Sequence, residues 1–342
     1  MITVLKKGML TTVQDLGRTG FQRYGMPSSG AMDEFSLRLG NLLVGNPQTE
    51  AALEFTFMGP SLRFETDTVF AVTGGLFDLK LNGESVPMNT ALPAKAGDEL
   101  VTGTALAGMR GYLAVAGGFA LEPVMGSRST GLKAKIGGMD GRALVDGDTL
   151  PLRAPGTVPF NMTKRTSPKN LLRKFPDTLT VHFTFGPQDD LFSKAGRQTF
   201  ISGKYTLSQQ SDRMGFRMDG PAVEKLEGTD GNIISDGICF GAIQVTNGQP
   251  IVMMADRQTT GGYPKIGCVV RADLPDLAQR RPGEAVRFSP LSPVGAQQMY
   301  TRYLTALDKL AAKLNAVLPS KMYTGFTLHA GERFFHVKIE EK

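Results

Sequence analysis

The stretch Gly237 to Pro264, GICFGAIQVTNGQPIVMMADRQTTGGYP, is the most informative part of this chain. Two apolar runs of strand length, Ala242 to Val245 and Pro250 to Ala255, are joined at Asn247-Gly248-Gln249, which predicts a β-hairpin. A dense polar block, Asp256 to Pro264, follows the second run. Its glycines would let the backbone approach a ligand closely, so the block is a candidate site, with a long surface loop as the alternative.

The composition is that of a folded, mainly β protein. The chain has 342 residues, of which 41% are hydrophobic and 20% charged, so disorder is not the default. Its 41 glycines and 20 prolines separate many short apolar runs, as in β-rich folds, and the length suits two domains. The formal net charge of +6 is mild for this size and does not indicate a nucleic-acid partner.

The cysteines and the N-terminus exclude several classes of protein. Cys239 and Cys268 each lie in an apolar run without a histidine or second cysteine at metal-ligand spacing, so we expect buried structural thiols and no tightly bound metal. The N-terminal sequence MITVLKKG lacks an apolar signal core, and no stretch approaches membrane-spanning length. We therefore expect a cytoplasmic protein with no membrane partner.

The chain divides into two β-rich blocks. We expect an N-terminal domain over residues 1–155, a linker over 156–176 and a C-terminal domain over 177–342 that ends in a helix and a hairpin. The linker is rich in proline and in basic residues without interleaved aromatics, which favours a solvated connector over a nucleic-acid patch. Gly-acid turns before apolar runs near the ends of both blocks favour two related barrels.

Individual elements can be predicted within these blocks. Asp33 can cap a helix that runs to about Val44, and Ser292 can cap a C-terminal helix. The apolar stripe of this second helix is expected to pack on the core and consists of Tyr300, Tyr303, Leu304, Leu307, Leu310, Leu314 and Val317. The clearest strands of the first block are Phe55–Phe57, Leu62–Phe64, Val69–Val72, Phe77–Leu81, Glu99–Thr102 and Tyr112–Ala116.

Four polar clusters could line a site. No phosphate-binding loop or dinucleotide fingerprint occurs, and the three histidines lack zinc-ligand spacing, so carboxylates, arginines and amides would have to carry any chemistry. Arginine suits carboxylate or phosphate recognition, although purely structural ion pairs are the alternative. The clusters are Gln14, Asp15, Arg18 and Thr19; Ser28, Ser29 and Asp33 at a helix start; Ser211, Asp212, Arg213 and Arg217; and Gln244 with Asp256, Arg257, Gln258, Thr259, Thr260, Gly261, Gly262 and Tyr263.

The order of these clusters resembles that of the biotin-dependent carboxyltransferase family, also called allophanate hydrolase subunit 2 or KipA-like. The motifs are TVQDLGRTGFQRYGMPSSGAMD, FGPQDD, SDRMG, GAIQVTNGQPIV, ADRQTTGGYP and LAQRRPGEAVRF, which cover nearly the whole chain. The resemblance implies two cyclophilin-like β-barrel domains with a few helices. It is greatest to the branch of the family that takes part in ATP-dependent 5-oxoproline cleavage.

That resemblance implies a reaction and partners. The reaction would open 5-oxo-L-proline to L-glutamate with hydrolysis of ATP. The chain would be active only together with the KipI-like B subunit of 5-oxoprolinase and its LamB/YcsF-type A subunit. A lactam is unreactive, so phosphorylation of its oxygen would need cations and amide donors nearby. Since no nucleotide loop is visible, ATP would bind at a shared interface between subunits.

Under this hypothesis the clusters take roles. Asp256, Arg213 and Gln258 are the candidate catalytic groups, with Asp256 as base or anchor. The candidate substrate- or nucleotide-binding residues are Gln14, Asp15, Arg18, Ser28, Ser29, Asp33, Gln244, Thr259, Thr260, Gly261, Gly262 and Tyr263.

Two alternative functions remain. One is the carboxyltransferase component of a biotin-dependent, urea-carboxylase-like enzyme, with biotin as cofactor, although this chain has neither an ATP-grasp-sized region nor a Met-Lys-Met attachment sequence. The other is a KipA-type regulatory binder that antagonises a KipI-like kinase inhibitor. The sequence does not assign the reacting groups to one chain of the complex, nor does it give the oligomeric state.

Overall fold

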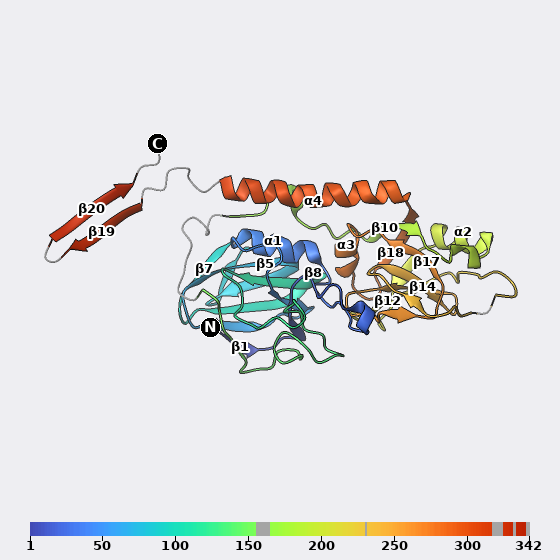
Figure 1. Ribbon diagram of the computed structural model, residues 1–342, viewed down its shortest axis with the longest axis horizontal. Coiled ribbons are helices and arrows are strands. Elements are labelled where there is room, and N and C mark those ends of the chain that lie inside the picture. Colours follow the sequence, from blue (N-terminus) through green and yellow to red (C-terminus); the bar gives the residue numbers. More distant parts are fainter. Residues whose placement is uncertain (155–164, 230, 317–323, 331–332, 340–342) are drawn as a thin grey trace.

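The computed structural model describes residues 1–154, 165–229, 231–316, 324–330 and 333–339. Within them the strands form a nine-stranded sheet in the N-terminal half, a closed seven-stranded barrel in the C-terminal half and two two-stranded ribbons (Figure 1). The predicted mainly β fold with a few helices is confirmed. The C-terminal unit is the closed barrel, whereas the N-terminal sheet curls around its core without closing in the described part of the chain.

The N-terminal sheet has strand order β2-β3-β8-β4-β1-β9, and β5 pairs with β6, β7 and β8. Its core is rich in phenylalanine, including Phe55, Phe64, Phe70 and Phe77. The strands are β1 (Ile2–Lys6), β2 (Leu10–Gln14), β3 (Ala52–Thr56), β4 (Ser61–Phe64), β5 (Thr68–Leu81), β6 (Glu84–Val86), β7 (Leu92–Ala94), β8 (Glu99–Val115) and β9 (Thr149–Leu150).

Two of these strands are longer than the sequence pattern indicates. β5 joins the predicted runs Val69–Val72 and Phe77–Leu81, and β8 likewise joins two predicted strands. Their pairing register shifts between Gly74 and Leu79, which is the signature of bulges. Gly74 has φ +107°, and a Cβ there would lie 2.3 Å from the carbonyl oxygen of Arg110. The glycines therefore bend continuous strands where the apolar pattern alone indicates a break.

The barrel confirms the hairpin predicted from the opening stretch. β14 and β15 pair from Ile243 to Thr246, and Thr246 faces Gln249 across a two-residue turn, Asn247-Gly248, with positive φ at both positions. The barrel order is β10 (Thr178–Phe185), β17 (Lys265–Val269), β14 (Ala242–Thr246), β15 (Gln249–Met253), β12 (Gly215–Asp219), β11 (Tyr205–Leu207) and β18 (Ala285–Pro290).

Four α-helices accompany the sheets in the described residues: α1 (Glu34–Leu43), α2 (Lys194–Ser202), α3 (Leu274–Ala278) and α4 (Pro293–Ala316). The predicted caps are confirmed, because the Asp33 side chain accepts a hydrogen bond from Ser36 N at 2.9 Å and Ser292 Oγ accepts one from Gly295 N at 3.1 Å. Short 3-10 helices span Gln22–Tyr24 (η1), Lys169–Leu171 (η3) and Asp189–Leu191 (η4). The remaining ribbons pair β13 (Asp236–Gly237) with β16 (Thr260–Gly261) and β19 (Thr324–Ala330) with β20 (Arg333–Ile339).

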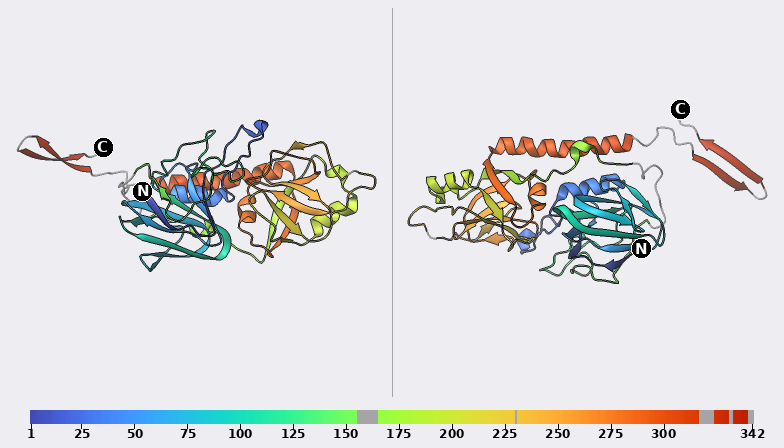
Figure 2. Two further views of the ribbon diagram at one scale, coloured as in Figure 1. Left: turned by 90° about the horizontal axis from the view of Figure 1, so that it is seen from below. Right: turned by 180° about the vertical axis from the view of Figure 1, so that it is seen from behind.

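Helix α4 joins the two halves of the molecule. It starts directly after the barrel strand β18 and runs along α1 of the N-terminal half (Figures 1 and 2). Leu307, Leu310 and Leu314 of α4 are buried in the same cluster as Leu39 of α1, so the predicted core role of this stripe is confirmed for these residues. Val317, the last residue of the predicted stripe, lies outside the described residues.

The basic segment before the barrel is a solvated connector only in part where it is described, since Lys169 and Lys174 are exposed but two arginines are not. Arg165 is buried and donates to the Leu42 carbonyl, and Arg173 lies over the ring of Phe35 and pairs with Asp33. The prediction is therefore wrong for Arg165 and Arg173, because these two side chains pack against the N-terminal half. The domain boundaries themselves stay a prediction. Among the described residues, no helix has the length and apolar character needed to cross a bilayer.

Candidate functional site

Arg213 lies at the centre of the contact between the two halves. Its Nε donates to Asp256 Oδ2 at 2.8 Å, and its Nη2 donates to Asp256 Oδ1 at 3.2 Å and to the Gly30 carbonyl at 2.6 Å. Its Nη1 pairs with Glu54 of β3. The side chain is 6% exposed and that of Glu54 only 2%. One guanidinium therefore ties the barrel to two segments of the N-terminal half.

The charges at this centre compensate one another. Burial by itself would lower the pKa of Arg213, but the Asp256 and Glu54 carboxylates hold it well above its usual range. Glu54 is further held by the Tyr112 hydroxyl at 2.6 Å and by the Met32 amide at 2.9 Å. The pKa of Tyr112 is raised by burial and by the Glu54 charge. This is a buried ionic network in which the charged groups are partnered, and it acts as a fixed joint between the two halves.

More hydrogen bonds and ion pairs join the two halves along this contact, which we call the seam. Asp33, besides capping α1, accepts from Arg173 at 2.6 Å and from Gln279 Nε2 at 2.7 Å. Arg271 pairs with Glu34. Gln279 Oε1 also accepts the amides of Met109 and Arg110, so Gln279 bonds across the seam to the N-terminal sheet. Asp33 was among the predicted site residues, but Glu34, Arg271 and Gln279 were missed by sequence reasoning, because partners more than 100 residues apart carry no local signal.

The side chains of the first polar cluster also make their hydrogen bonds inside the fold. Gln14 is fully buried, donates to Thr12 and the Thr130 carbonyl and accepts from Gly30 N. The Asp15 carboxylate accepts from Ser127 Oγ and Ser129 Oγ at 2.6 Å each, and also from two backbone amides. These acceptors hold the 120–141 loops against β2.

The predicted cationic groups lie in the interior. Arg18 is buried and donates to the Ser129 carbonyl, and burial lowers its pKa. Arg257 is buried and donates to the carbonyls of Ile238 and Met254 and to Ser28 Oγ. Ser29 is buried with φ +52°. None of these residues lines either of the two pockets described next.

The polar block after β15 lies on the outer face of the barrel between two pockets. Ala242 and Gln244 of β14 alternate with the core residues Ile243 and Val245, so the first two point outward. Gly261 packs so closely on this face that a Cβ there would lie 2.8 Å from Gln244 Nε2. Gln244 Nε2 itself donates to the Tyr263 carbonyl at 3.2 Å. Glycine at this position thus allows the polar block to pack closely against β14.

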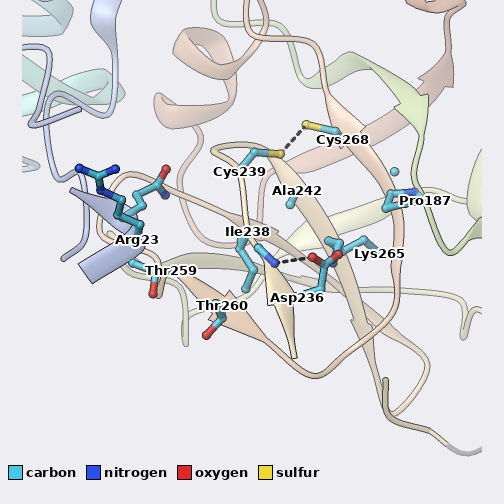
Figure 3. A pocket seen from close by; sticks show the side chains of 13 residues that line it. Arg23, Pro187, Asp236, Ile238, Cys239, Ala242, Thr259, Thr260, Lys265 and Cys268 are labelled. Atoms are coloured by element: carbon cyan, nitrogen blue, oxygen red, sulfur yellow. Dashed lines mark hydrogen bonds and ion pairs between the residues drawn. The ribbon is translucent and has the colours of Figure 1, made fainter. Parts of the chain in front are cut away.

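The larger pocket, of about 500 Å³, is formed where an N-terminal loop meets the barrel (Figure 3). Gln22 and Arg23 of η1 line it from the N-terminal half, and Thr259 and Thr260 line it from the polar block. The rest of its wall comes from β13, β14 and β17, from the connection between β13 and β14 and from Pro187, and it includes Asp236, Cys239, Lys265 and Cys268.

Lys265 and Asp236 are the paired charges of this pocket. Lys265 is buried, and its Nζ lies 2.9 Å from Asp236 Oδ2, whose carboxyl is half exposed. The hydrogen bond from Lys265 lowers the pKa of Asp236. Arg23 is exposed and stands over the ring of Tyr24. The pocket therefore offers two cations, one carboxylate and two threonine hydroxyls, a set that can hold a small anionic ligand with a carbonyl group.

The smaller pocket, of about 270 Å³, lies on the other side of the block. It is lined by Gln244, Gln258 and Tyr263 from the fourth predicted cluster and by Asp212 and Arg217 from the third. Amide groups dominate it, and no histidine or cysteine is among the described residues that line it. The Gly262 carbonyl between the pockets accepts from Ile233 N at 2.8 Å. The structure thus brings the polar block and Gln244 together at the two pockets, while Arg257 at the start of the block contacts Ser28 of the second cluster on the interior side.

Cys239 and Lys265 were not among the predicted site residues. The prediction of buried structural thiols is wrong for Cys239, which is exposed in the larger pocket. Its apolar neighbours Ile238 and Phe240 turn inward and give the sequence its core-like look, while the intervening residue faces out. Lys265 directly after Pro264 was the available signal for a charge at the start of β17. No group of three or more metal-ligating side chains gathers anywhere in the described ranges.

Known proteins match this chain over most of its length. The model of the family "Carboxyltransferase domain, subdomain A and B" matches residues 24–290. The C subunit of 5-oxoprolinase from Escherichia coli is 41% identical over 90% of this chain and 97% of its own length, and that from Haemophilus influenzae is 36% identical over 91% and 97%. The crystal structure of the Kluyveromyces lactis urea amidolyase matches with a TM-score of 0.85 and 34% identity over 90% of this chain, which spans 20% of that longer chain. By these matches, the chain belongs to the carboxyltransferase domain family, subdomains A and B, which it shares with the C subunits of 5-oxoprolinase.

Proposed function

We propose that this chain is the C subunit of an ATP-dependent 5-oxoprolinase, which cleaves 5-oxo-L-proline to L-glutamate with ATP hydrolysis. The observation that carries the proposal is the correspondence with the Escherichia coli protein over 97% of that protein's length. The match to urea amidolyase covers a fifth of the larger chain, so that enzyme's other regions have no counterpart in the aligned part of this one.

The larger pocket supports a cyclic amide acid as substrate. 5-Oxoproline carries one carboxylate and one lactam carbonyl. Lys265 and Arg23 can hold the carboxylate, and the hydroxyls of Thr259 and Thr260 can donate to the lactam oxygen, on which negative charge develops during ring opening. Arg213 acts as a positioning residue, because its bonds to Asp256 fix the start of the segment that carries both threonines.

ATP requires more positive charge than the two pockets beside the polar block offer. In the larger pocket the charges of Lys265 and Arg23 are offset in part by Asp236, which leaves enough for one carboxylate. Arg18, Arg213 and Arg257 are directed at interior acceptors. The residues of the larger pocket therefore fit a small carboxylate better than a triphosphate. We infer that ATP binds at an interface with the partner proteins, a KipI-like B subunit and a LamB/YcsF-type A subunit, in the cytoplasm.

Reconstitution tests this function. This chain is combined with the KipI-like and LamB/YcsF-type partners, and ADP and glutamate are measured with 5-oxoproline, urea or no substrate. The expected result is ADP release that requires 5-oxoproline, matches glutamate in amount and stops when this chain is left out. Turnover by the two partners alone, or no turnover by a complex that forms stably, would refute the proposal.

A second candidate is a carboxyltransferase acting on urea or a related amide. The similarity to urea amidolyase over 90% of this chain favours it. In that case carboxybiotin, delivered by another chain, would be the CO₂ donor. The reconstituted mixture separates the two, because the carboxyltransferase hypothesis predicts carboxylation of urea by a carboxybiotin donor and no glutamate from 5-oxoproline.

A further inference from the structure

The two cysteines of the chain meet in the larger pocket. The sequence contains two cysteines in 342 residues, 29 positions apart. Cys239 lies between β13 and β14, and Cys268 lies in β17. Their sulfur atoms are 3.4 Å apart. Figure 3 shows the two side chains pointing toward one another. Cys239 is exposed and Cys268 is half-buried, so a small reagent in the pocket can reach the pair.

The fold holds the two sulfurs together by pairing their strands. Ala242 is the cross-strand partner of Cys268 in the β14–β17 ladder. The Ala242 amide donates to the Cys239 carbonyl at 3.2 Å, so the turn carries Cys239 back over the start of β14. Arg257 Nε donates to the Ile238 carbonyl at 3.2 Å and fixes the residue before Cys239. The approach of the thiols is thus set by backbone contacts on both sides.

The surroundings make one thiol acidic and the other a proton donor. The hydrogen bond from Cys268, with the nearby charges of Arg257 and Lys265, lowers the pKa of Cys239 to about 6, although burial acts against this. The same hydrogen bond, together with burial, raises the pKa of Cys268. At neutral pH Cys239 is a thiolate next to a protonated Cys268.

We propose that Cys239 and Cys268 form a redox modification site that takes a hydroperoxide and closes to an intramolecular disulfide. The Cys239 thiolate attacks the distal peroxide oxygen, the O–O bond breaks, and the released alkoxide or hydroxide takes a proton to leave as alcohol or water. The sulfenic acid formed on Cys239 is then attacked by Cys268 sulfur, which gives up its proton, and the hydroxyl leaves as water. The peroxide is reduced by two electrons, and the two thiols are oxidised to one disulfide.

Closure of the disulfide changes the wall of the pocket. A disulfide requires an S–S separation of about 2.05 Å, so the sulfurs must approach each other by roughly 1.4 Å. Cys239 lies on the connection between strands, whereas Cys268 is within a paired barrel strand, so we expect Cys239 to move. The resulting loss of 5-oxoproline turnover rests on the proposed function, whereas formation of the disulfide does not.

The test uses the full chain, reduced and then exposed to hydrogen peroxide at pH 7. The expected result is a fall from two titratable thiols to none, a mass lower by two hydrogens, and a monomer on a non-reducing gel. Cys268→Ser should accumulate a sulfenic acid that dimedone traps, and Cys239→Ser should react far more slowly. Circular dichroism of both variants checks that they fold. Two thiols that stay titratable, or a disulfide formed between chains, would overturn the proposal.

The pH profile and the turnover assay complete the design. In the native chain, the pH profile of the Cys239 alkylation rate should have its midpoint near pH 6, against about 8.5 for an ordinary thiol. The rate in Cys268→Ser should differ from the native rate. A native midpoint at the ordinary value would overturn the assignment of Cys239 as the attacking thiol. If the disulfide forms but turnover by the assembled complex is unchanged, the link to the pocket fails. If the reduced complex has no turnover, the proposed function fails and the modification site stands.

Discussion

Replacing Arg213 by methionine should destabilise the protein strongly. The change keeps the length of the apolar stem and removes the charge and all four polar contacts of the guanidinium. The Glu54 carboxylate, 2% exposed, and the Asp256 carboxylate, 11% exposed, would lose their cation. Breaking a buried ion pair by removing one partner costs about 3–5 kcal/mol, because the remaining charge cannot be hydrated. We expect a loss in this range.

The measurement is urea denaturation followed by circular dichroism, because the chain has no tryptophan. Arg217→Met is the matched control: it lies on the neighbouring strand β12, its side chain is exposed, and we expect a change within about 0.5 kcal/mol. Arg213→Lys should fall between the two, because it keeps the charge but not the planar fork. A loss below about 1 kcal/mol for Arg213→Met would refute the role of Arg213 as the joint of the two halves.

Three further predictions concern stability. The hydrogen bond from Arg142 lowers the pKa of Asp148, so this carboxylate stabilises the fold above its unfolded pKa of about 3.9, and the stabilisation is lost as pH falls through the lower folded pKa. Asp148→Asn should therefore cost about 0.5–1 kcal/mol at pH 7. A cost that persists at about pH 2 would contradict this. Gly74→Ala should destabilise more than Gly83→Ala by about 1–3 kcal/mol in urea denaturation, because both have positive φ but only Gly74 would meet backbone; equal costs would disprove the bulge argument. Arg173→Met should cost about 1.5–3 kcal/mol through its two carboxylate partners, whereas a solvated side chain would cost almost nothing.

Local signals predicted local structure. The Asn247-Gly248 turn, the Asp33 cap and the cap at Ser292 each depend on residues within a few positions, and all three are confirmed. The polar block after β15 does line two pockets, as Thr259 and Gln258 illustrate.

The rest depends on contacts that no local pattern records. Arg213 and Glu54 are 159 positions apart, so their pairing could be found only from the fold. A buried ion-pair network and an active site use the same residue types, and the sequence pattern therefore grouped Arg213 and Asp256 with residues that line a pocket. Cys239 looked like a core residue because its neighbours are apolar, and only the strand geometry turns it outward.

The most direct test of the account is the KM for 5-oxoproline of the assembled enzyme carrying Lys265→Met in this chain. Lys204→Met is the control, since its side chain is exposed and lines neither pocket. If the larger pocket binds the substrate carboxylate, the KM should rise at least about tenfold, equivalent to about 1.4 kcal/mol, and the control should be unchanged. An unchanged KM in a folded Lys265→Met complex would contradict the claim that this pocket holds the substrate.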